Sequence, residues 1–265
     1  MKNYGVLLGQ RPTDYLAGSI TALPYEIRIP DGNWKPYLPI GEKQQPYFVD
    51  SMACVTFSQL NAVETQEFFL TGKQSNYADR FTAKKSGTML NGNYLYAVAD
   101  SIRKDGLVLE EDYPSPKDFT WNEYYAEPPQ ELTAKGKIWL QKWSFSYEFI
   151  PISKENLIHH LKHAPLQIVI PGHAILNFFC EDDVADYFDS YEPYLKTTPY
   201  ANIQACLKPL LIRKELMNQA KVVKSKTSAT VYVCEPVPDM DYLTKKASLE
   251  GFSVPEPIPD TDSLI

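Results

Sequence analysis

The sequence predicts an α+β protein of two lobes, in which a helical lobe is followed by a lobe built from a β-sheet or barrel. Helical spacing of apolar residues dominates the first half of the chain, and short apolar runs bounded by turns dominate the second half. Helices that precede strands, rather than alternate with them, favour this class. A chain of 265 residues is long enough to give two lobes a substantial core.

The chain divides into four predicted parts. Residues 1–45 are rich in Pro, Tyr and Gly and are expected to wrap over the surface as extended segments and turns. Residues 46–135 form the predicted helical lobe, and residues 136–234 form the predicted β-rich lobe. Residues 235–265 carry repeated Pro and several carboxylates, so we expect an extended acidic tail outside both lobes.

Two main helices are expected in the helical lobe. The first begins at Cys54 and is predicted to be amphipathic, because its apolar side chains keep helical spacing with polar ones between them: Phe57, Leu60, Val63 and Phe68 against Ser58, Asn61 and Glu64. The second runs from Tyr94 to Ile102 and ends at Gly106, since glycine favours a helix C-terminus. Residues 71–93 are polar and predict a loop.

The second lobe is expected to consist mainly of strands. One short helix interrupts them over residues 153–162, with Ser153 as its N-cap. Residues 201–218 fit either a helix or a strand, because Pro209 interrupts a helical pattern. The expected strands cover 138–140, a tract ending at 150, 166–170, 174–179, a hairpin partner within 185–191, and 229–234.

Composition and charge restrict the function classes. The formal net charge is −7 and no basic run is interleaved with aromatic residues, which argues against nucleic acid as a partner. No apolar run has the length of a membrane span, and the first apolar run is too short for a secretory signal, so we expect a soluble cytoplasmic protein. The four cysteines form no CxxC pair and are expected to be reduced.

No metal or cofactor is expected. The acidic run at residues 181–183 lacks the pattern of a calcium-binding loop and is interpreted as a solvated turn.

Cys54 is the first candidate for chemistry. A helix N-terminus exposes unpaired N–H groups and the positive end of the helix dipole, which lower the pKa of a thiol and can hold an oxyanion. The alternative interpretation is that Cys54 is a small buried apolar residue. His173 is the second candidate, because it follows a Pro-Gly turn at a strand boundary, where a side chain can face a cleft.

Residues 30–195 resemble the papain-like cysteine peptidases, which divide a catalytic cysteine and histidine between two lobes. Five short motifs occur in the family's order: Cys54 with Phe57, Ser58 and Glu64; Asn91-Gly92-Asn93; Tyr113-Pro114; Gly172-His173-Ala174-Ile175; and Asp189-Ser190-Tyr191. Each motif alone is weak, and their order carries the resemblance.

The resemblance implies a cysteine-type endopeptidase acting on a protein or peptide substrate. Cys54 would be the nucleophile, His173 would move its proton, and Asp189 would orient the imidazole at a position where the family usually has asparagine. Gln45 would complete the oxyanion hole with the Cys54 backbone N–H. The substrate-binding loop would be Asn91, Gly92 and Asn93.

Some positions depart from the family pattern. Val55 replaces a tryptophan beside the nucleophile, and Phe48 stands where the oxyanion glutamine is usual, so Gln45 enters the register only through an insertion. Ser51 and Leu90 replace two cysteines that form a disulfide in secreted members, as a reducing compartment would allow.

Other interpretations stay open. A catalytically dead papain-like scaffold could serve as a structural or interaction protein, including a virus-encoded or virion-associated one, and a cell-wall amide hydrolase could use the same cysteine and histidine chemistry. The remaining histidines lie in or near the helix predicted over 153–162 and are interpreted as surface or helix-capping residues: His159, His160 and His163.

Overall fold

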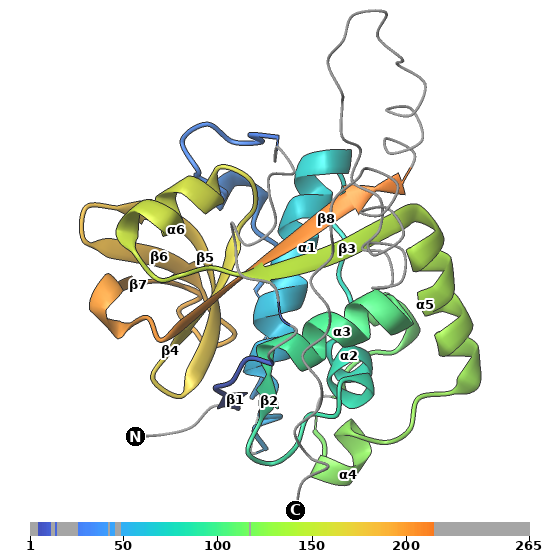
Figure 1. Ribbon diagram of the computed structural model, residues 1–265. Coiled ribbons are helices and arrows are strands. Elements are labelled where there is room, and N and C mark those ends of the chain that lie inside the picture. The colour runs from blue at the N-terminus through green and yellow to red at the C-terminus, as the bar shows by residue number, and fades with distance from the viewer. Residues whose placement is uncertain are drawn as a thin grey trace, which may run out of the picture.

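The computed structural model describes residues 5–11, 14, 26–41, 43–45, 49–116 and 118–214 (Figure 1). The predicted strand over residues 229–234 and the predicted acidic tail over residues 235–265 lie outside the described residues.

Helices and strands occupy different parts of the molecule. The helices are α1 (Cys54–Thr71), α2 (Asp79–Lys85), α3 (Leu95–Asp105), α4 (Trp121–Tyr124), α5 (Gln130–Lys142), α6 (Lys154–Leu161) and the 3₁₀ turns η1 (Lys35–Tyr37), η2 (Glu110–Asp112) and η3 (Tyr200–Asn202). The strands are β1 (Val6–Leu7), β2 (Asn93–Tyr94), β3 (Trp143–Phe149), β4 (Leu166–Ile170), β5 (His173–Glu181), β6 (Val184–Phe188), β7 (Leu195–Pro199) and β8 (Ala205–Arg213).

The described strands from β3 onward form one antiparallel sheet of six, in the order β3-β8-β4-β5-β6-β7. Figure 1 shows α2, α3 and α5 on one side of α1, and β4 to β7 with α6 on the other side. The predicted two-lobed α+β fold is confirmed. α1 runs between the lobes and contacts both α3 and the strands β5 and β8.

α1 is buried on all sides over its first 13 residues, from Cys54 to Gln66. The predicted amphipathic pattern is therefore wrong, because packing between two lobes covers the polar face as well. The buried polar side chains form hydrogen bonds, as burial requires. The Ser58 hydroxyl donates to the Cys54 carbonyl at 2.7 Å, and the Glu64 carboxylate accepts the Tyr77 backbone N–H at 2.8 Å.

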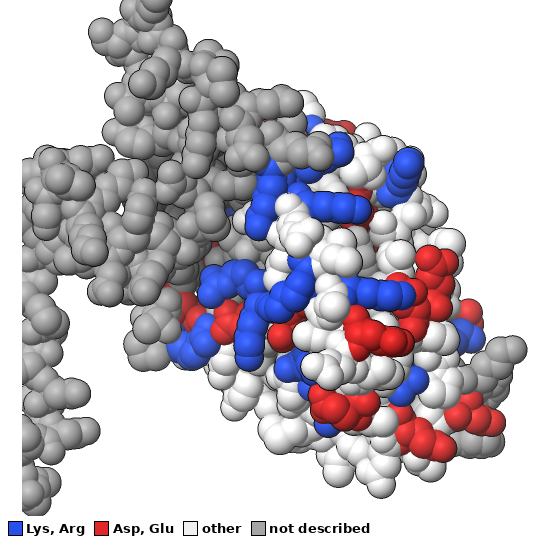
Figure 2. All heavy atoms as spheres, turned by 90° about the vertical axis from the view of Figure 1, so that its right-hand side faces the viewer, with Lys and Arg blue, Asp and Glu red and all other residues white. Residues whose placement is uncertain are grey.

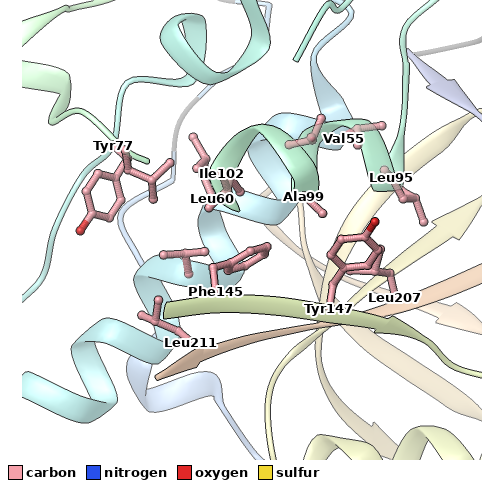
Figure 3. Packing of buried hydrophobic residues seen from close by; sticks show 14 of the residues in the cluster. Val55, Leu60, Tyr77, Leu95, Ala99, Ile102, Phe145, Tyr147, Leu207 and Leu211 are labelled. Carbon is pink, nitrogen blue, oxygen red and sulfur yellow. The ribbon is translucent and has the colours of Figure 1, made fainter. Parts of the chain in front are cut away.

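One hydrophobic cluster joins α1 and α3 to the paired strands β3 and β8 (Figure 3). Its labelled side chains come from all four elements and are Val55, Leu60, Leu95, Ala99, Ile102, Phe145, Tyr147, Leu207 and Leu211, with Tyr77 beside them. Because this core lies directly behind the first turn of α1, it holds the N-terminal end of that helix in place.

Several predicted elements are confirmed. α3 ends with Gly106 as its C-cap, and in α6 the Ser153 side chain accepts the Asn156 N–H as an N-cap. Strands β4, β5 and β6 lie where the apolar runs predict them. The ambiguous segment is a strand, β8, in which Pro209 lies beyond the stretch 205–207 that pairs with β4.

Two predictions of secondary structure were wrong. The segment 138–140 belongs to helix α5 rather than to a strand, because Leu132, Gly136 and Trp139 bury one helical face of a Lys- and Gln-rich segment. The segment 71–93 contains helix α2, which has Asp79 in its first turn and lysines in its last turn.

Three backbone segments, at Gly5, Met52 and Gly92, meet closely near the N-terminus of α1. β1 pairs in parallel with β2, so that Val6 lies opposite Asn93. Gly92 has φ 98°, and a Cβ there would lie 2.0 Å from the carbonyl carbon of Gly5. A Cβ at Gly5 would lie equally close, at 2.0 Å, to the carbonyl oxygen of Met52. Glycine is therefore required at both positions for the loop before Cys54 to pack.

The surface carries separate regions of charge. Figure 2 shows Lys and Arg side chains gathered on part of the face where α5 lies, with Asp and Glu beside them. Several of these cations have acidic partners, such as Lys135 with Asp112 and Lys85 with Glu127. Among the described residues, no helix combines the length and the apolar character that crossing a membrane requires.

Candidate active site

Cys54 is the first residue of α1, as predicted, and its side chain has no exposed surface. Its Sγ accepts a hydrogen bond from the Ala174 backbone N–H at 3.4 Å. Ala174 follows His173 at the start of β5. The N-terminus of α1 and the strand that carries the candidate histidine are therefore in direct contact.

The pKa of Cys54 is raised to about 12, against the prediction of a lowered pKa. Burial is the main cause, because it disfavours the thiolate. The Ala174 N–H acts in the opposite direction, but the negative charges of Asp50 and Asp189 raise the pKa further. Position at a helix N-terminus therefore does not by itself activate this thiol.

His173 and Asp189 form a buried hydrogen-bonded pair. The distance between His173 Nε2 and Asp189 Oδ1 is 2.6 Å, and the two residues are 5% and 4% exposed. The imidazole nitrogen in this hydrogen bond is Nε2, and Nδ1 is the second ring nitrogen. The pairing of these two residues follows the resemblance.

Lys196 on β7 is a site residue that the sequence analysis missed. Its Nζ lies 2.6 Å from Asp189 Oδ2 and 2.9 Å from the Tyr191 carbonyl oxygen. Burial would raise the pKa of Asp189, but the hydrogen bonds and positive charges of His173 and Lys196 outweigh it and lower that pKa. A single lysine in a short exposed strand carries no motif that would have identified it.

The glutamine that reaches this region is Gln44 rather than the predicted Gln45. Gln44 is 1% exposed, its Nε2 donates to Asp50 Oδ1 at 2.8 Å, and its Oε1 accepts the Ser190 hydroxyl at 3.0 Å. Gln45 is only partly buried. Because two adjacent glutamines fit one motif, the unknown length of the insertion left the register ambiguous by one residue.

Asp50 connects the loop before Cys54 to the segment after Asp189, and it too was missed as a site residue. Its carboxylate accepts the Met52 N–H at 2.8 Å and the Tyr191 hydroxyl at 2.5 Å. The Tyr191 ring is tilted against the His173 ring, with 5.5 Å between their centroids. Tyr191 therefore covers the candidate histidine from one side.

The residues of the predicted substrate-binding loop, Asn91 to Asn93, differ in burial and in their contacts. Asn93 is 5% exposed, and its side-chain amide donates within the protein to Ser86 and Thr88. Asn93 therefore holds the loop in shape. Asn91 is exposed, and Gly92 closes a tight turn with Met89 through paired backbone hydrogen bonds. Asn91 remains a candidate for contact with a substrate, whereas Gly92 is buried against Gly5.

The other histidines lie on or beside α6, away from Cys54. His159 is exposed, as predicted, but His160 and His163 are buried, which corrects the surface interpretation for both. His163 Nδ1 lies 3.0 Å from the Glu26 carbonyl oxygen, and His160 Nδ1 lies 3.2 Å from Lys208 Nζ. Burial and the Lys208 charge lower the pKa of His160 to about 3.

Comparisons with known proteins identify the fold. No family model and no curated protein matches the sequence. Procathepsin L 3 from the larval midgut of Tenebrio molitor is 14% identical, with 78% of this chain and 76% of that chain covered and a TM-score of 0.54.

Two further solved structures are also similar. One, from a study of the mite allergens Blo t 1 and Der p 1, is 13% identical, covers 74% of both chains and has a TM-score of 0.50. A Carica candamarcensis cysteine protease in complex with E-64 is 14% identical over 67% of this chain and 96% of that chain, with a TM-score of 0.49. The chain therefore has the papain-like α+β fold of two lobes.

Proposed function

We propose that the protein is a cysteine-type endopeptidase, with Cys54 as nucleophile, His173 as general base and acid, and Asp189 as the orienting group. The observation that carries the proposal is the contact between the lobes. The Cys54 sulfur accepts a hydrogen bond from the residue next to His173, while His173 is held by Asp189 at 2.6 Å. Nucleophilic catalysis needs a thiol within reach of an oriented imidazole, and these two contacts support that arrangement.

In this mechanism the Cys54 sulfur attacks the peptide carbonyl carbon while its proton passes to His173. The carbonyl oxygen becomes an oxyanion, and His173 then protonates the leaving amine as the carbon–nitrogen bond breaks. Water hydrolyses the resulting thioester and restores the thiol. The Nε2 hydrogen bond to Asp189 is kept throughout, so Nδ1 is the nitrogen that carries the transferred proton.

We assign the second oxyanion donor to Gln44 and predict that Gln44→Ala lowers kcat by about 10²- to 10³-fold, the usual cost of removing such a donor. The Gln44 amide is fixed between Asp50 and Ser190, beside the loop that leads to Cys54. Gln45→Ala is the matched control and should change kcat less than about threefold. A larger loss for Gln45→Ala would return the role to Gln45.

Asp189→Asn should move the alkaline limb of the pH–activity profile to lower pH. The carboxylate stabilises imidazolium by charge, whereas an amide accepts the same hydrogen bond without charge. His173 in the variant therefore loses its proton at lower pH, and activity that requires the thiolate–imidazolium pair falls earlier. Alkaline limbs that coincide in the two proteins would exclude an electrostatic role for Asp189.

A second candidate function is a binding scaffold without catalysis, favoured by the full burial and the raised pKa of Cys54. Labelling with a thiol-directed epoxide peptidase inhibitor separates the two. The endopeptidase is expected to be modified at Cys54 and to lose hydrolysis in proportion. An unmodified Cys54 together with no cleavage of a peptide library would favour the scaffold.

A further inference from the structure

One carboxylate contacts both an imidazole and an ammonium group at this site. Asp189 Oδ1 faces His173 Nε2, and Asp189 Oδ2 faces Lys196 Nζ, both at 2.6 Å. The Asp189 side chain is 4% exposed, whereas that of Lys196 is 26% exposed. Lys196 therefore supplies positive charge to a buried group from a partly exposed position on β7.

Negative charge surrounds the candidate thiolate on two sides. Asp50 precedes α1 and Asp189 follows β6, and both interact unfavourably with an anion at Cys54. The groups that face Asp189 are His173 on β5, Lys196 on β7, Tyr187 on β6, Cys54 on α1 and the nearby Tyr191. Of these, Lys196 is the ammonium group.

We propose that Lys196 is a positioning residue that partly offsets the charge of Asp189, so that the carboxylate holds and stabilises the His173 imidazolium while placing less negative charge beside Cys54. This inference rests on the proposed endopeptidase function for its catalytic meaning. Lys196 also donates to the Tyr191 carbonyl oxygen, and the Tyr191 ring packs against His173. The Lys196 side chain therefore contacts both the carboxylate that holds the imidazole and the residue, Tyr191, whose ring packs against it.

The sign of the effect follows from electrostatics. Removal of a positive charge makes the site more negative, so each nearby group keeps its proton to higher pH. The His173 imidazolium and the Cys54 thiol should both shift in this direction. The whole pH–activity profile of Lys196→Met is therefore expected to move to higher pH, whereas a purely structural defect would lower activity and leave both limbs in place.

The test measures the titration of His173 by NMR in the full chain, with the signal assigned from its loss in His173→Gln. We expect the midpoint in Lys196→Met to rise by about one pH unit relative to wild type. Lys196→Arg keeps the charge and should titrate like wild type. Lys196→Gln is the second neutral variant and should behave like Lys196→Met, which covers the case in which Lys196→Met does not fold.

Coincident midpoints in wild type and a folded neutral variant would overturn the role of Lys196. An upward shift in Lys196→Arg equal to that in the neutral variants would also overturn it, because charge would then not be the cause. The NMR titration needs no turnover. Wild-type protein that hydrolyses no peptide would therefore contradict the proposed endopeptidase function separately, whatever the titration shows.

Discussion

Cys54→Ala is expected to lower kcat/KM for a cleavable peptide by about 10³-fold or more, because members of a catalytic triad act as a unit. The variant keeps His173 and Asp189 but lacks the sulfur that we propose attacks the carbonyl carbon. Hydrolysis of a fluorogenic peptide measures the loss. The protein should remain folded, since the change removes one buried atom from a well-packed helix end and costs about 1 kcal/mol.

Cys180→Ala is the matched control for that experiment. Cys180 is also a free, buried cysteine, but it lies in the β5 strand with its thiol hydrogen-bonded to Asn177 at 3.4 Å. The same atoms are deleted, so the same small loss of stability is expected while kcat/KM stays close to wild type. Equal activity in Cys54→Ala and Cys180→Ala would disprove the role of Cys54 as the nucleophile.

Gly92→Ala should lower the free energy of unfolding by about 4 kcal/mol or more, a size that only a severe steric conflict produces. The new Cβ would lie 2.0 Å from the Gly5 carbonyl carbon, and backbone cannot move aside as a flexible side chain can. Relief would require β1 to separate from β2 and the loop through Met52 to shift. Urea unfolding measures the change.

Gly87→Ala separates this conflict from simple backbone strain. Gly87 also has a positive φ, 77°, but nothing lies within 4 Å of a Cβ added there. Its substitution should therefore cost only about 1–2 kcal/mol, the penalty of a left-handed conformation for a residue with a Cβ. If the two variants were equally stable, close packing of Gly92 against Gly5 would not limit stability.

The elements that could be predicted from sequence are those with a local signal. α3 and α6 have caps and periodic apolar residues, and β4 and β5 are continuous apolar runs. α2 and α5 were missed because both contain few apolar residues and depend on tertiary packing for their stability. The burial of the polar side chains of α1 could not be predicted, because it results from a second lobe that closes over the helix.

In the candidate site too, residues in local motifs could be predicted from sequence, whereas properties that depend on tertiary packing could not. Cys54, His173 and Asp189 could be selected because each stands in a short motif and the motifs keep their order. The raised pKa of Cys54 could not be predicted, because desolvation is a property of the assembled lobes. Asp50 and Lys196 were missed because contact with the site depends on the arrangement of β6 and β7, not on a local pattern.

The place of β8 in the sheet has a consequence for folding during synthesis. β8 is translated after every other described strand, yet it lies between β3 and β4 and contacts α1. Until β8 leaves the ribosome, β3 lacks the strand with which it pairs, and the apolar side chains facing α1 stay in water. The nascent chain therefore carries an unpaired β3 edge from the synthesis of Phe149 until that of Arg213, a condition under which chaperones are useful.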